Sequence, residues 1–193
     1  MQTRTATVTR KTRETDITLS LTLDGSGQAT LETGIGFFEH MLHSLARTSL
    51  FDLTLQARGD LHVDQHHTIE DVGIVLGQAF AQAIGNRTGI RRFASALLPM
   101  DEALVQVALD ISGRAFLQWN GDIPVNPALN FDTQMVEEFF RAFASNAWLT
   151  LHVDILKGRN THHIVEAIFK AAGLALRQAV EIDPKITGVL STK

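Results

Sequence analysis

The sequence predicts an α+β protein made of an internally duplicated β-rich unit, with amphipathic helices packed on one face of the sheets. One observation behind this prediction is a repeated motif. HHTIEDVG begins at His66 and HHIVEAIF begins at His162, and each places a glutamate three residues after its second histidine. Another is that short segments recur at the same offset of 96 positions, such as LTL at 53–55 and 149–151. We therefore expect one globular domain, 1–193, made of two pseudo-repeats.

The pseudo-repeats are expected at about 1–90 and 91–193, and periodicity places the elements of the first one. Apolar and polar side chains alternate from Ile17 to Leu23, as in a half-buried strand. The residues DGSG that follow are typical of a turn. We expect a short helix at about 37–47, a strand at 51–57, and a longer helix from the first histidine pair to about Ile84.

The second half follows a similar order. Strands are expected at 95–100, 103–110 and 115–119, and a helix at 133–145, while the segment 120–130 is the best candidate for a mobile loop. The helices that begin at the histidine pairs carry apolar side chains at matching steps of three and four residues. These core positions are Ile69, Val72, Leu76, Ala79 and Ala83 in one helix and Val165, Ile168, Ala172, Ala175 and Ala179 in the other.

The overall composition excludes several classes of protein. With 45% hydrophobic residues among 193, the chain can bury a sizeable core. A net charge of −4 gives no reason to expect a nucleic-acid or membrane partner, and no apolar run is long enough to span a membrane. Cysteine is absent, which rules out thiolate metal ligands and favours a cytoplasmic protein. A local basic cluster is typical of a solvated strand edge: Arg4, Arg10, Lys11 and Arg13.

The paired histidines indicate metal binding. Residues four apart share a helix face, so His66 can converge with Glu70, and His162 with Glu166. Adjacent side chains diverge by about 100°, so the two rings of a pair cannot easily bind one ion. Two such half-sites predict two metal ions, each completed by the other half or by another subunit. Imidazole and carboxylate ligands without thiolate favour an octahedral divalent ion, Mn²⁺ first.

Other interpretations stay open at this point. These side chains could instead cap helix N-termini, although two registered copies, with His40 and His43 nearby, favour metal binding. A metal that only staples an oligomer together, or a metal-dependent hydrolase of a phosphorylated small molecule, would use the same residues. No Gly-rich phosphate loop precedes a helix, so a phosphate would be bound by side chains such as Arg92, Arg114, Lys170 and Lys193.

Five segments in order carry a resemblance to a known family. They are TRETDITLSLTLDGSG, FFEHMLHSLARTSLFDLTLQARGDLHVDQHHTIEDVGIVLGQAF, DEALVQVALDISGRAF, LHVDILKGRNTHHIVEAIFKA and the terminal STK. Together they resemble imidazoleglycerol-phosphate dehydratase, an enzyme of histidine biosynthesis, over nearly the whole chain. The resemblance implies a duplicated β-rich fold, a cage of 24 subunits with active sites between neighbours, and two Mn²⁺ ions per active site.

The resemblance also implies roles for individual residues. Metal ligands fall on His40, His66, His67, Glu70, His162, His163 and Glu166. Substrate-binding groups fall on Glu14, Arg92, Arg114, Lys170, Ser191 and Lys193. Three positions depart from the family pattern, because Glu138 stands where a further histidine ligand is expected, and Ser44 and Thr48 stand where a glutamine and a histidine are common.

Helix geometry and the resemblance together suggest how the ligands divide. We expect His66, Glu70 and His163, with Glu138 or water, to hold one ion, and His40, His67, His162 and Glu166 to hold the other.

The implied reaction converts imidazole glycerol phosphate to imidazole acetol phosphate and water. The proton to be lost is not next to a carbonyl, so no ordinary enolate can form. Two divalent ions on the imidazole ring would stabilise an imidazolate, whose electrons can expel the neighbouring hydroxyl. Glu14 is the expected general acid/base, because it lies outside the histidine clusters, and Glu166 is also assigned to catalysis.

Overall fold

The computed structural model describes residues 3–191. The first half comprises β1 (Thr5–Lys11), β2 (Thr15–Thr22), β3 (Ala29–Glu32), α1 (Gly36–Ser49), β4 (Asp52–Gly59) and α2 (His66–Ile84). The second half comprises β5 (Phe93–Met100), β6 (Ala103–Asp110), β7 (Phe116–Asn120), the 3-10 turn η1 (Pro127–Leu129), α3 (Gln134–Ala147), β8 (Thr150–Lys157) and α4 (Thr161–Val180). Each helix and strand expected from the sequence is present, and β1, β3 and β8 are additional.

The two halves share one sheet topology, which confirms the duplication. The strand orders are β1-β2-β4-β3 and β5-β6-β8-β7. In each sheet three strands are antiparallel, and the fourth, β3 or β7, pairs in parallel with its neighbour. The expected basic cluster at a strand edge is explained by β1, which is an edge strand and contains Arg10 and Lys11.

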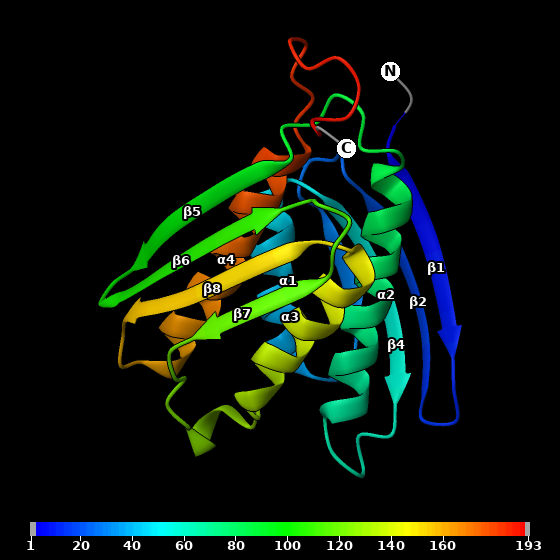
Figure 1. Ribbon diagram of the computed structural model, residues 1–193. Helices are drawn as coiled ribbons and strands as arrows, with labels where there is room; N and C mark the ends of the chain where they lie inside the picture. The colour runs from blue at the N-terminus through cyan, green and yellow to red at the C-terminus, as the bar shows by residue number, and fades with distance from the viewer. Residues whose placement is uncertain (1–2, 192–193) are drawn as a thin grey trace.

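The helices lie between the two sheets, so each sheet is covered on one face. α2 packs on β1 and β2 of the first sheet, while α4 packs on β5 and β6 of the second. Helices of opposite halves then pack in pairs, α2 against α3 and α1 against α4. Figure 1 shows the helices behind the second sheet, with β1, β2 and β4 of the first sheet at the right, beside α2. The predicted apolar stripes of α2 and α4 are all buried and belong to one hydrophobic core that draws on both halves.

Two glycines allow the paired helices to approach closely. A Cβ on Gly77 of α2 would lie 2.7 Å from the carbonyl oxygen of Phe143 in α3. A Cβ on Gly173, 96 positions later in α4, would lie 2.7 Å from the carbonyl oxygen of Leu45 in α1. Each contact is shorter than van der Waals packing permits, so these positions require glycine.

None of the helices among residues 3–191 is long and apolar enough to span a membrane.

Candidate metal centre

Both histidine pairs lie in the first turn of a helix, at the same end of the molecule. α2 and α4 run in the same direction, and their N-termini lie at the lower side in Figure 1. Asn160 caps α4 by accepting hydrogen bonds from the backbone N–H groups of His162 and His163. Asp64 accepts one from the backbone of His66. The local sequence therefore fixes where each pair begins.

Three of the expected ligands converge within one chain. Donor atoms of His40, His162 and Glu166 all lie within 4.8 Å of one another. Nε2 of His162 is 3.1 Å from Oε2 of Glu166, and Nε2 of His40 is 3.5 Å from the same oxygen. Donors held at about 2.1 Å from one ion and at right angles are about 3 Å apart, so this cluster fits a divalent cation with small side-chain adjustments.

Glu166 is the buried member of the cluster, and α1 and α4 both contribute to its surroundings. Oε1 accepts hydrogen bonds from Nζ of Lys170 at 2.7 Å and from Oγ of Ser44 at 3.3 Å. Burial by itself raises the pKa of Glu166, but Lys170, with His40 and His162, outweighs it and leaves the pKa below its ordinary value. The carboxylate is therefore kept ionised, as a metal ligand must be. Thr48 donates within its own helix, to the carbonyls of Ser44 and Leu45.

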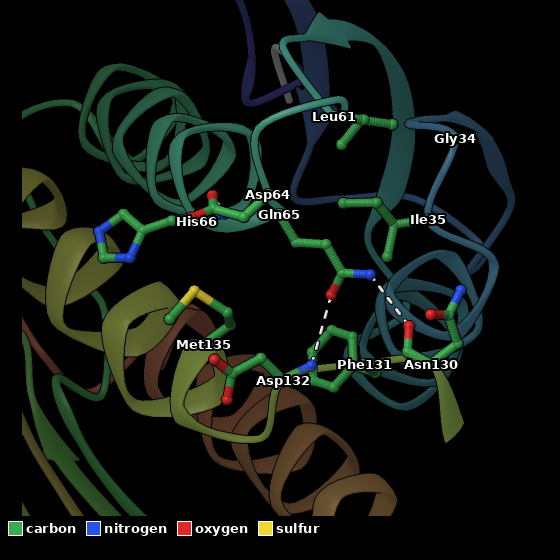
Figure 2. Close-up of a pocket in the computed structure, with 10 residues that line it drawn as sticks. All are labelled: Gly34, Ile35, Leu61, Asp64, Gln65, His66, Asn130, Phe131, Asp132 and Met135. Carbon is green, nitrogen blue, oxygen red and sulfur yellow. Dashed lines mark hydrogen bonds between the residues drawn. The ribbon is translucent and has the colours of Figure 1, made fainter. Parts of the chain in front are cut away.

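The first histidine pair forms a second, looser half-site beside a pocket. Nε2 of His66 is 3.7 Å from Oε2 of Glu70, as the spacing predicts. The adjacent pocket has a volume of about 490 Å³ and is lined by Gly34, Ile35, Leu61, Asp64, Gln65, His66, Asn130, Phe131, Asp132 and Met135 (Figure 2).

Figure 2 also shows how this pocket is held together. The Gln65 side chain donates to the carbonyl of Asn130 at 2.9 Å and accepts from the backbone N–H of Asp132 at 3.4 Å. These two bonds tie the start of α2 to the segment before α3, so the position of His66 depends on both halves.

His67 and His163, the second histidines of the pairs, turn away from their neighbours. The ring planes within the pairs are inclined at 79° and 83°, with centroids 6.1 and 6.4 Å apart. Nδ1 of His67 bonds to Asp60 at 3.0 Å, and Nδ1 of His163 bonds to Glu102 at 2.8 Å. The predicted divergence is confirmed, and the expected grouping of His67 with His40 and of His163 with His66 does not form within one chain.

Asp60 and Glu102 were not among the residues expected from the sequence. The bond to Asp60 raises the pKa of His67, and the same bond lowers the pKa of Asp60. Hydrogen bonds from His163 and from the backbone N–H of Asn160 lower the pKa of Glu102 to about 2. The sequence signal for Glu102 was its place in the turn between the strands predicted at 95–100 and 103–110.

Glu14 is placed near the first pair by the turn between β1 and β2. Its Oε2 is 3.9 Å from Nδ1 of His67. The turn is fixed to α2 by the buried Asp71, which accepts a hydrogen bond from Thr15 at 2.5 Å and pairs with Nε of Arg10 at 3.0 Å. Glu14 is therefore held within reach of the first histidine pair without being part of α2.

Glu138 does not join the cluster in the described chain. Its Oε1 is 3.8 Å from Nε of Arg141, one turn along α3. Among residues 3–191, only His40, His162 and Glu166 form a group of three potential ligands within chelating distance.

The expected phosphate-binding residues divide between two places. Arg92, Arg114 and Ser191 line one pocket of about 280 Å³, together with Arg87, which sequence reasoning missed. Lys170 lies elsewhere, beside Glu166, and Lys193 falls outside the described residues. The backbone of Arg92 bonds to Ala179, 17 residues beyond His162, so this pocket is about 26 Å along α4 from the metal cluster at 1.5 Å per residue.

The fold and the cluster together define the class of protein: a duplicated α+β chain in which imidazole and carboxylate groups converge as a possible metal site. Comparison with known proteins narrows this class. The family model described as imidazoleglycerol-phosphate dehydratase matches residues 33–176. A protein of that name from Gluconacetobacter diazotrophicus is 59% identical over 98% of this chain and 96% of its own length. Another, from Acetivibrio thermocellus, is 58% identical over 96% of this chain and 95% of its own.

Solved structures of imidazoleglycerol-phosphate dehydratases have the same fold as this chain. The imidazoleglycerol-phosphate dehydratase of Staphylococcus aureus superposes with a TM-score of 0.84 and 38% identity, covering 93% of this chain and 99% of that one. The enzyme from Pyrococcus furiosus, in complex with (S)-C348, superposes with a TM-score of 0.83 and 34% identity, covering 96% and 98%. This chain belongs to the imidazoleglycerol-phosphate dehydratase family and is an enzyme of the carbon–oxygen hydro-lyase class, acting in histidine biosynthesis.

Proposed function

We propose that this chain converts imidazole glycerol phosphate to imidazole acetol phosphate and water, with two Mn²⁺ ions per active site. The observation that carries the proposal is the convergence of His40, His162 and Glu166, on a chain of this family, in a geometry that a divalent cation can occupy. The lack of thiolates and the mixture of imidazole and carboxylate favour Mn²⁺ among such cations. We also infer a cytoplasmic location from the absence of cysteine.

Two sets of residues would hold the ions. His40, His162 and Glu166 supply most of one set, and His66 with Glu70 begins the other. His67 and His163 face away from these sets in their own chain, so they would complete sites on neighbouring copies. Bound divalent ions would supply Lewis-acid stabilisation of the imidazolate form of the substrate.

Glu14 is the residue proposed to move the proton. It lies 3.9 Å from His67, beside the ligands, and the Asp71 anchor holds its turn against α2. A carboxylate in this place can take the proton from the substrate carbon and return one to the leaving hydroxyl, while its position keeps it out of the ligand set. Glu166 is the other residue assigned to catalysis. Its role would be to hold, with His40 and His162, an ion that stabilises the imidazolate form of the substrate.

The pocket of Arg87, Arg92, Arg114 and Ser191 is proposed to bind the substrate phosphate, which guanidinium groups grip well. A substrate of one ring, three carbons and a phosphate is far shorter than the 26 Å or so that separates this pocket from the metal cluster along α4. The separation supports active sites shared between chains, as in the proposed cage of 24 subunits. Within each chain, the shared helical core supports treating 1–193 as one domain.

The test is a turnover assay. Metal-free protein is reloaded with Mn²⁺ and given imidazole glycerol phosphate, and both imidazole acetol phosphate and free phosphate are quantified. Ketone product without phosphate release is expected. Phosphate release would instead support the metal-dependent hydrolase, and metal binding without turnover would support a metal that only staples the oligomer.

A further inference from the structure

In each half of the protein, Nδ1 of the second histidine of the pair is hydrogen-bonded to a carboxylate. The two halves supply this carboxylate from different structural elements. In the first half the partner of His67 is Asp60, the first residue after β4. In the second half the partner of His163 is Glu102, in the turn between β5 and β6.

Glu14 and Glu102 occupy corresponding positions in the two halves. Glu14 is the residue before β2, and Glu102 is the residue before β6. Both approach the second histidine of a pair, yet only Glu102 makes the hydrogen bond, at 2.8 Å compared with 3.9 Å for Glu14.

The reason for this difference lies in the residue that follows β4 in the first sheet and β8 in the second. The residue after β4 is Asp60, whereas the residue after β8 is Gly158, which has no side chain. In the second half Glu102 therefore performs the task that Asp60 performs in the first. It also accepts hydrogen bonds from the backbone N–H groups of Arg159 and Asn160, at 3.2 and 2.7 Å, which fix it to the loop before α4.

We infer that Asp60 and Glu102 are positioning residues that hold Nδ1 of His67 and His163 so that Nε2 of each ring is presented to a metal ion. Because Asp60 occupies Nδ1 of His67, Glu14 is left free for proton transfer, while its counterpart Glu102 is committed to orientation. This inference rests on the proposed function and deepens it.

The physical argument concerns the tautomer of a neutral imidazole. A ring that donates its Nδ1 proton to a carboxylate has its lone pair on Nε2, which is the form that a metal ion binds. Among the described residues, Nε2 of His67 has no hydrogen-bond partner, and Nε2 of His163 is 3.7 Å from its nearest carboxylate oxygen, on Asp101. Both nitrogens are therefore available to an ion.

The test compares metal affinity across five variants of the full chain. Asp60→Ala and Glu102→Ala remove the acceptors, whereas Asp60→Asn and Glu102→Gln keep a carbonyl oxygen that can accept the Nδ1 proton. Asp16→Asn is the matched control, because Asp16 lies on the same hairpin as Glu14 and, among residues 3–191, forms its ion pair with Lys11 at the surface. Mn²⁺ affinity is measured by chelator competition, and Co²⁺ binding by visible absorption.

Each alanine variant is expected to bind metal about 10- to 100-fold more weakly, as for other residues that orient a metal-binding histidine. The amide variants should recover most of this loss, and Asp16→Asn should match the wild type. Wild-type affinity in the alanine variants, or amide variants as weak as the alanine ones, would overturn the orienting role.

If the alanine variants do not fold, the tautomer itself can be measured. In metal-free wild-type protein labelled with ¹⁵N-histidine, His67 and His163 should carry the proton on Nδ1 when neutral, and protonation on Nε2 would contradict the inference. These readouts are independent of turnover. A wild-type protein without dehydratase activity would refute the proposed function, whereas unchanged metal affinity in the variants would refute only this inference.

Discussion

Arg92 holds the carboxylate of Asp110 in a two-pronged ion pair. Its Nε lies 2.6 Å from Oδ1, and its Nη2 lies 3.0 Å from Oδ2. The remaining nitrogen, Nη1, donates to the carbonyl of Leu190 in the C-terminal segment. Asp110 raises the pKa of Arg92 further above its ordinary value. Arg92 therefore joins the end of β6 to the tail that closes the proposed phosphate pocket.

Replacement of Asp110 by asparagine should weaken both the fold and substrate binding. The variant loses a charge-assisted pair whose partners are each less than one-fifth exposed, so the free energy of unfolding should fall by about 1–3 kcal/mol. Because Arg92 then loses its fixed orientation, KM should rise more than kcat falls. Chemical denaturation and steady-state kinetics check the two effects, and an unchanged KM would remove this pair from the phosphate site.

Replacement of Glu14 by glutamine should abolish turnover while leaving metal content intact. Glutamine keeps the size of the side chain but cannot accept the substrate proton, and general acid/base residues commonly contribute about 10²–10⁴ to the rate. Metal content by elemental analysis and kcat by product formation are the measurements. A near wild-type rate would eliminate Glu14 as the base.

Glu102 should make the free energy of unfolding depend on pH in the acid range. Its folded-state pKa of about 2 lies below the ordinary 4.5, so its stabilising contribution is complete above about pH 4.5 and is lost as the pH falls toward 2. Urea unfolding of metal-free wild type and Glu102→Gln should therefore differ most near neutral pH and converge on acidification. Curves that stay parallel across this range would show that the carboxylate does not titrate with folding.

Gly173→Ala should destabilise the pairing of α1 with α4. The added methyl group would lie 2.2 Å from Oγ1 of Thr48 and 2.7 Å from the carbonyl oxygen of Leu45. Overpacking of this kind costs about 1–3 kcal/mol, which thermal or chemical unfolding would detect. Gly36→Ala is the control, since nothing lies within 4 Å of its added Cβ, and it should leave stability equal or slightly higher.

The elements that periodicity predicted were those with one buried face. The strand around Ile17 alternates cleanly, and the helix from His66 ends at Ile84 as expected, because burial imposes the pattern on the sequence. β1 was missed because its one buried residue is Val8 and its end is charged. β3 has four residues, half-buried and exposed in turn, which is too short for a period to be read.

The contacts of the site also divide into those that the sequence predicts and those that it does not. Contacts within one helix turn, such as His66 with Glu70 and His162 with Glu166, follow from spacing alone. Contacts that depend on the packing of distant segments do not, and these include the approach of His40 to Glu166 and of Asp60 to His67. Likewise, the commitment of Arg92 to Asp110 depends on the register between β5 and β6, which pairs Phe93 with Asp110.

The metal cluster and the arginine pocket lie at opposite ends of α4, and this has a genetic consequence. If each active site takes its metal ligands from one chain and its phosphate pocket from another, mutations at the two ends of α4 belong to separate complementation groups. A chain altered at His162 and a chain altered at Arg114, each inactive alone, would restore some activity when assembled together, because certain sites would then receive both intact contributions. Two alterations at the same end would not rescue one another.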